Sequence, residues 1–185
     1  MIKGSIPKAT FRRAVFLDRD GVINKSLVRD GRPYAPTHLT DFEILPGVAD
    51  ALLNLRRAGY LNIVVTNQPD IKTGMQSSEV LKLMHLRLFN DLAIDDIQVC
   101  PHTDEDRCSC RKPLPGMLVD AAESFHIRLS ESWMIGDRWR DIAAGQAAGC
   151  RCFFIDYGYI ERQPEQPFNC VASLLEAVAF IVGRE

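Results

Sequence analysis

The chain has 185 residues, of which 46% are hydrophobic and 25% charged, and its formal net charge at pH 7 is −2. A chain of this length and composition can bury a substantial core, so we expect one soluble domain over residues 1–185. The small negative charge excludes a general attraction to nucleic acid or to an anionic membrane, and neither is expected as a partner. No segment resembles a signal peptide or a membrane span, which predicts a cytoplasmic protein.

Two acids follow the first apolar run of the chain. Residues 14–17 have the composition of a buried parallel strand, and Asp18, Asp20 and Gly21 come directly after them. Ligands of open α/β sheets bind at the carboxyl ends of the strands, and glycine lets the chain turn sharply there. One carboxylate could attack phosphorus while the other moves the proton of the leaving oxygen, with a divalent cation to balance the charge. An ordinary polar turn would explain the same residues.

The remaining elements alternate between strands and helices. Residues 24–44 are polar and rich in turn-forming residues, which predicts a long loop beside the two acids, either a substrate wall or a plain surface loop. This loop is too short for an independently folded cap domain, so we expect an open site. Further strands are predicted at 62–65, 97–99, 133–135 and 151–155, with amphipathic helices between them and a last helix near 174–181. The alternation predicts a doubly wound, Rossmann-like, mainly parallel sheet with helices on both faces.

Polar residues follow two of these later strands, and a lysine lies between them in the sequence. Thr66 and Asn67 end the strand at 62–65, and a threonine hydroxyl and nearby amides can donate hydrogen bonds to phosphoryl oxygens. Lys112 can neutralise both a carboxylate and an incoming phosphate. Gly136 and Asp137 end the strand at 133–135, which places a third acid at the same edge.

A cysteine-rich segment lies at about residues 100–110. It contains four potential metal ligands, Cys100, His102, Cys108 and Cys110. One imidazole and three thiolates can complete a tetrahedral zinc site without water, the closed arrangement of structural zinc. The alternative is a set of free thiols with an incidental histidine. The other three cysteines have no histidine nearby and are predicted to be packed thiols.

The order of these motifs resembles that of the haloacid dehalogenase (HAD) phosphatases. Their four motifs are matched in order by Asp18 with Asp20, by Thr66, by Lys112, and by Gly136 with Asp137. The Thr-Asn-Gln sequence, the cysteine and histidine spacing, and the Cys-Arg-Lys-Pro sequence are particularly similar to the group of heptose bisphosphate and histidinol-phosphate phosphatases. The chain departs from that group at residues 69–71, where Pro-Asp-Ile stands in place of the usual Ser-Gly-Ile.

The resemblance implies a role for each residue of the motifs. Asp18 would be the nucleophile and Asp20 the general acid and base. The transferring phosphoryl group would be held by Thr66, Asn67 and Lys112, and Arg111 would contact a second phosphate or the sugar. Magnesium would be bound by Asp18, the main-chain carbonyl of Asp20, and Asp137. Zinc would be bound by the four residues of the cysteine-rich segment. Asp141 would either support the water shell of the magnesium or cap a helix.

The resemblance also implies an activity. We expect magnesium-dependent hydrolysis of a small phosphorylated sugar through an aspartyl-phosphate, by a monomer or weak oligomer, with a heptose bisphosphate as the substrate and histidinol phosphate as the alternative. A phosphoacceptor domain like the response regulators is an alternative of another class. It also combines acids, magnesium and lysine on a doubly wound sheet, but such domains ordinarily lack the second acid and a zinc loop.

Overall fold

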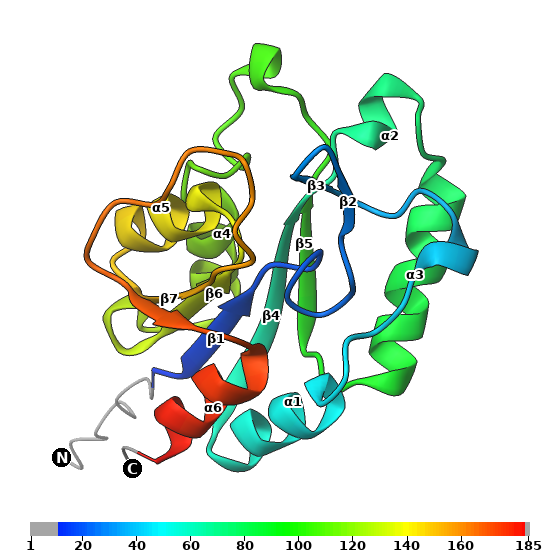
Figure 1. The fold of residues 1–185 in the computed structure, drawn as a ribbon. Helices are drawn as coiled ribbons and strands as arrows, with labels where there is room; N and C mark the ends of the chain where they lie inside the picture. Colours follow the sequence, from blue (N-terminus) through cyan, green and yellow to red (C-terminus); the bar gives the residue numbers. More distant parts are fainter. Residues whose placement is uncertain (1–10, 184–185) are drawn as a thin grey trace, which may run out of the picture.

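A six-stranded parallel sheet forms the centre of the computed structural model, which describes residues 11–183 (Figure 1). The order across the sheet is β5-β4-β1-β6-β7-β8, and every neighbouring pair is parallel. Its strands are β1 Arg13–Leu17, β4 Tyr60–Asn67, β5 Asp96–Cys100, β6 Trp133–Gly136, β7 Arg151–Ile155 and β8 Asn169–Val171. The predicted doubly wound fold and all five predicted strands are confirmed. Strand β8, a short edge strand, was not predicted, because three residues leave no periodicity to detect.

Helices cover both faces of the sheet (Figure 1). The α-helices are α1 Val48–Arg57, α2 Asp70–Thr73, α3 Ser78–Asp91, α4 Gly116–Phe125, α5 Trp139–Ala147 and α6 Leu174–Val182. Short 3-10 turns occupy Leu39–Asp41, Asp104–Asp106 and Leu129–Glu131. No helix among the described residues is long and apolar enough to cross a membrane.

Successive side chains of β1 enter two different cores. Val15 and Leu17 pack in a cluster with residues of α1, α3 and α6, whereas Ala14 and Phe16 pack in a cluster with residues of α4 and α5. Side chains of a strand alternate between the faces of a sheet, so a strand covered on both sides must be apolar throughout. The uninterrupted apolar run before Asp18 follows from this double burial.

The direction of the strand order reverses beside β1. The chain passes from β1 to β4 and β5 on one side and then returns to place β6, β7 and β8 on the other. The amide of Asp18 donates to the carbonyl of Ile135 at 2.9 Å, which joins the ends of β1 and β6. A reversal of this kind leaves a crevice at the carboxyl ends of the strands, where ligands of such sheets bind. Asp18 and Asp137 both lie at this position.

The segment predicted as a loop between β1 and α1 contains a small antiparallel hairpin. Its strands are β2 Leu27–Arg29 and β3 Arg32–Tyr34. The amide of Ile160 donates to the carbonyl of Gly31 at 2.8 Å, so the loop after β7 lies against the tip of the hairpin. No cap domain is inserted here, as predicted.

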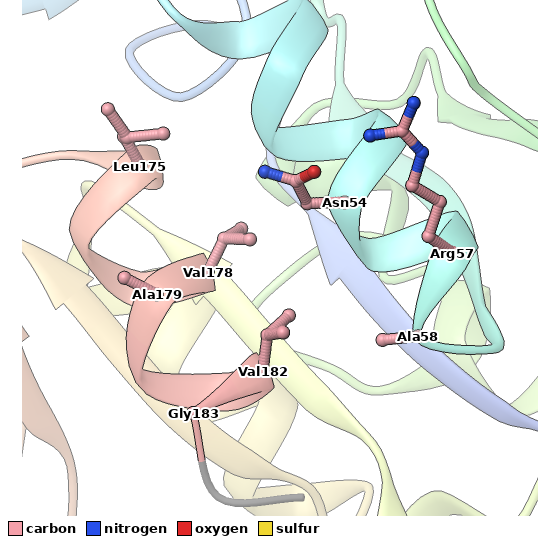
Figure 2. A pocket seen from close by; sticks show the side chains of 8 residues that line it. All are labelled: Asn54, Arg57, Ala58, Leu175, Val178, Ala179, Val182 and Gly183. Carbon is pink, nitrogen blue, oxygen red and sulfur yellow. The ribbon is translucent and has the colours of Figure 1, made fainter.

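One groove lies away from all the motifs. A cavity of about 580 Å³ opens between α1 and α6 and is lined by Asn54 and Arg57 of α1 and by Leu175, Val178 and Val182 of α6 (Figure 2). In Figure 1 these helices lie at the end of the molecule opposite the cysteine-rich loop. None of the residues expected to act in catalysis lines this groove.

Candidate active site

Asp18 and Lys112 form a buried ion pair at the centre of the sheet edge. The Nζ of Lys112 donates to Oδ1 of Asp18 at 2.7 Å and to the carbonyl of Val65 at 2.7 Å, and it lies 2.6 Å from Oδ1 of Asp141. These contacts satisfy the three protons of the ammonium group. Burial works against the charge of Lys112, but the carboxylates of Asp141 and Asp18 outweigh it and raise the pKa of Lys112.

Asp137 approaches the turn after β1 very closely. A Cβ atom added to Gly21, whose φ is +88°, would lie 1.9 Å from Oδ2 of Asp137. Gly21 is therefore required for two reasons: the backbone conformation has a positive φ, and the Asp137 carboxylate approaches too closely for a side chain. Both carboxylate oxygens of Asp137 are buried with no close hydrogen bond among residues 11–183, and the nearby hydroxyl of Tyr159 works to lower the pKa of this carboxyl group. A buried carboxylate in this state lacks a counter-charge of its own.

The charges of this cluster do not balance. The carboxylates of Asp18, Asp137 and Asp141 offer oxygens within 4.8 Å of one another. Three carboxylates against the one ammonium of Lys112 leave two negative charges uncompensated. Burial, followed by the charge of Asp141, raises the pKa of Asp18 to about 7, and burial with the charge of Asp18 raises the pKa of Asp137 well above its usual range. The oxygen ligands and the missing charge fit a hard divalent cation such as magnesium.

Asp141 has contacts in two directions. One oxygen lies beside Lys112, and the other accepts a hydrogen bond from the amide of Arg138 at 2.9 Å, at the start of α5. The second contact is the helix-capping role that the sequence left open. Because Asp141 also lies in the carboxylate cluster, its support of the water shell of the magnesium stays a prediction.

Asp20 points into a separate network. The guanidinium of Arg19 donates to both of its carboxylate oxygens, at 2.9 and 3.0 Å from Nη2. Asn24 donates to Oδ1 at 2.9 Å and Gln68 to Oδ2 at 2.8 Å. Arg19 is fully buried, and a buried guanidinium needs a carboxylate partner. Asp20 must give up one or more of these hydrogen bonds when its carboxyl group takes up a proton.

His85 closes this network behind Arg19. Its Nε2 lies 3.3 Å from Nη1 of Arg19. Because a guanidinium has only donors, the ring nitrogen must be the acceptor, and the ring must be neutral. Burial, together with the positive charge of Arg19, lowers the pKa of His85 to about 4. The sequence analysis assigned no role to this histidine.

Thr66 and Asn67 differ in what their side chains can still bind. The amide of Asn67 donates to the carbonyl of Lys112 at 3.0 Å, and its oxygen accepts from the amide of Lys112 at 3.1 Å, so both ends are engaged. The hydroxyl of Thr66 accepts from Gln68 at 2.8 Å, which leaves its own proton free for another acceptor. Asn67 thus holds the main chain of Lys112, while Thr66 retains a donor.

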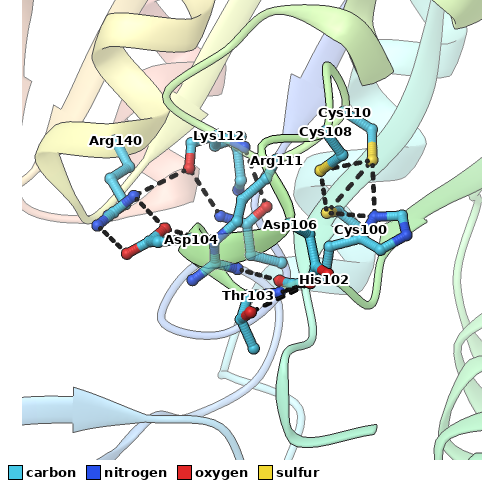
Figure 3. A network of polar contacts seen from close by, with 11 residues as sticks. Cys100, His102, Thr103, Asp104, Asp106, Cys108, Cys110, Arg111, Lys112 and Arg140 are labelled. Atoms are coloured by element: carbon cyan, nitrogen blue, oxygen red, sulfur yellow. Dashed lines mark hydrogen bonds and ion pairs between the residues drawn. The ribbon is translucent and has the colours of Figure 1, made fainter. Parts of the chain in front are cut away.

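The cysteine-rich segment brings its four predicted ligands together (Figure 3). The Sγ of Cys100 lies 3.7 Å from that of Cys108, 3.3 Å from that of Cys110 and 3.6 Å from Nδ1 of His102. Cys110 lies 3.4 Å from both Cys108 and His102. Sulfur and nitrogen ligands around tetrahedral zinc lie about 3.5 to 3.8 Å apart, whereas a disulfide requires about 2.05 Å. The arrangement therefore fits a tetrahedral metal ion and excludes a disulfide.

Arg111 contacts the same segment. Its Nε donates to Oδ1 of Asp104 at 2.7 Å and its Nη1 to the carbonyl of His102 at 2.9 Å (Figure 3). Arg140, in the first turn of α5, donates to both oxygens of Asp104, at 3.1 and 3.0 Å. The hydrogen bond from Arg111 and the charges of the two arginines lower the pKa of Asp104. Two guanidinium groups thus converge on one ionised carboxylate at the rim of the site.

The chain is similar to phosphatases in sequence and in structure. Residues 109–177 match the HAD-hydrolase-like family. A D-glycero-beta-D-manno-heptose-1,7-bisphosphate 7-phosphatase of Pseudomonas putida is 37% identical over 159 residues, covering 83% of this chain and 88% of the relative. The one of Salmonella typhi is 39% identical over 148 residues, covering 73% and 75%. The chain belongs to the HAD phosphatases.

A solved structure extends the similarity of this HAD phosphatase to nearly its whole length. The D,D-heptose 1,7-bisphosphate phosphatase of B. bronchiseptica, complexed with magnesium and phosphate, aligns with a TM-score of 0.81 and 27% identity, covering 94% of this chain and 99% of the other. The predicted phosphatase activity is thereby confirmed. Membership of this family favours an enzyme over the phosphoacceptor signalling domain.

The sequence analysis of this HAD phosphatase missed several residues of the site. Arg19, Gln68, Asp104 and Arg140 all contact predicted site residues, yet none was assigned a role. An arginine directly after a fully apolar strand was the clearest indication, since a charge in that position must be buried with a partner. Asp104 and Arg140 are 36 residues apart and gave no local pattern.

Proposed function

We propose that this phosphatase removes the 7-phosphate of D-glycero-beta-D-manno-heptose 1,7-bisphosphate. Relatives that carry this name are 33 to 39% identical over most of the chain. The observation that carries the proposal is the buried ion pair between Asp18 and Lys112, flanked by carboxylates whose charge calls for a divalent cation. This is the arrangement that an aspartate needs to attack a phosphate ester.

Asp18 is the nucleophile in this proposal. One of its oxygens attacks the phosphorus of the 7-phosphate, forms an aspartyl-phosphate and releases the sugar oxygen. Lys112 lies 2.7 Å from Asp18 and offsets the negative charge of both the nucleophile and the phosphoryl group. Thr66 donates its free proton to a phosphoryl oxygen, and Asn67 acts by holding the main chain of Lys112.

Asp20 is the general acid and base. It gives a proton to the leaving sugar oxygen, and afterwards removes one from the water that attacks the aspartyl-phosphate. Its hydrogen bonds from Arg19, Asn24 and Gln68 orient the carboxyl group between these two steps. Arg111 lies at the rim and contacts the rest of the substrate.

Two metals complete the proposed enzyme. Asp18, Asp137 and the main-chain carbonyl of Asp20 would hold magnesium, which when bound supplies positive charge to the transferring phosphate. Zinc in the cysteine-rich segment would be structural, since four protein ligands leave no position for water or substrate. Because Cys110 directly precedes Arg111 and Lys112, the zinc would set the position of these two cations.

A screen of phosphate esters tests the proposal. Release of inorganic phosphate is measured with and without magnesium from both anomers of heptose 1,7-bisphosphate and from histidinol phosphate. We expect magnesium-dependent turnover with the highest kcat/KM for the beta anomer, the substrate in the relatives' name. Asp18→Asn is the control for contaminating phosphatase. A kcat/KM for histidinol phosphate equal to or above that for the heptose bisphosphate would contradict the assigned substrate.

A further inference from the structure

Two of the side chains that donate to Asp20 are each held by a second acceptor. The amide of Asn24 also donates to the carbonyl of Lys25 at 3.1 Å. The amide of Gln68 also donates to the hydroxyl of Thr66 at 2.8 Å. The two protons of an amide nitrogen lie in one plane, so the second hydrogen bond sets the direction of the first. The position of the Asp20 carboxyl group is therefore determined by donors that are themselves anchored.

Arg19 is the third donor, and its second acceptor lies on a different element. Its Nε and Nη2 donate to Oδ1 of Asp20 at 3.1 and 2.9 Å, which uses one edge of the planar guanidinium. The remaining nitrogen, Nη1, lies 3.3 Å from Nε2 of His85, in the middle of α3. His85 is the one acceptor that meets Nη1 among the described residues. It therefore has the anchoring place for Arg19 that a carbonyl and a hydroxyl have for the two amides.

The guanidinium of Arg19 is shielded from solvent that could replace the histidine. Its side chain is 0% exposed, and its guanidinium carbon lies 5.7 Å from the centre of the buried Phe42 ring. A buried donor that loses its acceptor either turns toward another acceptor or keeps an unsatisfied proton. Because the same guanidinium binds the carboxylate of Asp20, a rotation of Arg19 also displaces Asp20.

Proton transfer is sensitive to a displacement of this kind. A general acid has to lie within hydrogen-bond reach of the oxygen that it protonates. Misplacement by about an ångström can reduce a rate about a hundredfold. His85 takes no direct part in the reaction, since it lines a surface cavity beside α3, together with Leu86 and Phe89, and not the site at the strand ends. Its influence on the reaction passes through Arg19.

We propose that His85 is a positioning residue for proton transfer, which holds the guanidinium of Arg19 so that the carboxyl group of Asp20 meets the leaving oxygen of the substrate. The inference rests on the proposed function, in which Asp20 is the general acid, and deepens it. The position requires a hydrogen-bond acceptor, because a guanidinium offers donors only. Glutamine can place its side-chain oxygen where Nε2 of the histidine lies, whereas leucine has a similar size and accepts nothing.

The dependence of the rate on the leaving group tests this role. A sugar alkoxide needs a proton as it leaves, whereas the phenolate of 4-nitrophenyl phosphate leaves without one. Single-turnover reactions in the presence of magnesium, with enzyme in excess, measure release of the leaving group before the aspartyl-phosphate is hydrolysed. The alkyl ester is heptose 1,7-bisphosphate, or histidinol phosphate if the wild-type protein does not hydrolyse the heptose. Both classes of ester are compared in the wild-type protein and in its variants.

The expected pattern is a selective loss that an acceptor restores. His85→Leu should slow the alkyl ester by about tenfold or more and 4-nitrophenyl phosphate by less than about twofold. His85→Gln should return the alkyl ester to within about threefold of the wild-type rate. Asp20→Asn should show the same selectivity with a loss of about a hundredfold or more. Leu86→Ala, at the next residue of α3 and in the same surface cavity, is the control and should change neither rate.

A second substitution keeps the test valid if leucine prevents folding, which circular dichroism detects. His85→Asn retains a polar side chain that is too short to reach Nη1 of Arg19, and it should give the same selective loss as His85→Leu. Its larger effect on the alkyl ester than His85→Gln would again separate the position of the acceptor from the polarity of the residue.

The inference and the proposed function fail with different results. Equal losses with the two esters in a folded His85 variant, or no loss with the alkyl ester, would overturn the positioning role, while Asp20→Asn still shows its selective loss. A deficit in His85→Gln as large as in His85→Leu would overturn it as well. If Asp20→Asn lost both esters equally, Asp20 would not be the proton donor, and the inference would fall with that part of the mechanism. Hydrolysis of histidinol phosphate alone would overturn the assigned substrate and leave the positioning role to the same comparison.

Discussion

The catalytic centre proposed above and the cysteine-rich loop both contain clusters of charged side chains, but these clusters lie in opposite physical environments. Asp18 and Asp137 are buried at the ends of strands, Asp141 in the first turn of α5, and Lys112 in the turn that follows the cysteine-rich loop. Asp104 and its neighbours Glu105 and Asp106 stand on an exposed turn. The three aspartates of the first group are supported by the packed sheet and by α5, whereas Lys112 directly follows the loop that carries the four potential metal ligands and the second group lies on it.

This difference decides how strongly each charge depends on its neighbours. In the buried centre, removing one partner leaves another charge without water to solvate it, so the residues act as a unit. On the exposed turn, water replaces a lost partner, and single ion pairs are exchangeable. The structure therefore combines a buried group of interdependent charges with exposed charges whose ion pairs are exchangeable, and the following changes test that contrast.

The largest effect is expected at the nucleophile. Asp18→Asn should reduce kcat by about a thousandfold or more, because an amide does not attack phosphorus. The same change removes one of three crowded carboxylates, so the melting temperature of the metal-free protein should not fall. Steady-state kinetics and thermal unfolding check the two expectations. Asp120→Asn, at an exposed position on α4, is the control. Wild-type turnover in Asp18→Asn would remove the proposed mechanism.

Substitutions of Asp137 and Asp20 should differ in their effect on magnesium affinity. Asp137→Asn should weaken magnesium binding by at least about tenfold, because its two oxygens are buried beside Asp18 and form no close hydrogen bond in residues 11–183. Asp20→Asn should retain most of the affinity, because the side chain of Asp20 is already bonded to Arg19 and Gln68. Titration calorimetry with magnesium measures both. If Asp20→Asn lost the metal and Asp137→Asn kept it, the ligand assignment would be wrong.

Removal of a proposed zinc ligand should reduce the rate only by displacing residues of the catalytic centre. Cys108→Ser should lower zinc content and reduce kcat by about a hundredfold, since a displacement of Lys112 by about an ångström is enough for such a loss. Excess magnesium should not restore the rate. Elemental analysis and kinetics are compared with Cys170→Ser, which removes an exposed thiol outside the cluster. Full activity in zinc-free protein would show that zinc binding by the loop does not contribute to catalysis.

The smallest effect concerns stability rather than turnover. The pKa of His85 is lowered from 6.5 to about 4, so below pH 6.5 the unfolded chain takes up a proton that the folded chain does not. The free energy of unfolding should therefore fall as pH decreases from 6.5 to 4, by roughly 1 to 2 kcal/mol for this partly exposed ring. Above pH 6.5 this contribution is complete and constant.

Urea unfolding at several pH values tests the role of His85. His85→Gln should show a shallower decrease in stability over the same range than the wild-type protein, because glutamine does not titrate. Carboxyl groups that titrate near pH 4 are common to both proteins and cancel in the comparison. Parallel pH profiles for the two proteins would show that His85 is not held neutral by Arg19.

The sequence by itself determined the fold class and the strand-end positions of the motif residues. Four short segments that the sequence predicts as strands place Asp18, Thr66, Cys100 and Asp137 at one edge of a parallel sheet, because parallel strands end at the same side. The close spacing of cysteines and histidine within the segment from Cys100 to Cys110 likewise predicted a cluster from local reach alone.

Only the tertiary structure decided which charged groups meet. Lys112 reaches Asp18 across 94 residues, and Arg140 reaches Asp104 across 36. Such pairs depend on the order of strands in the sheet and on the helix that follows β6, neither of which has a local pattern. Arg19 and Asp20 are neighbours in sequence, but their pairing follows from the burial of Arg19 against α3 and His85, which excludes water and leaves the adjacent carboxylate as its counter-charge.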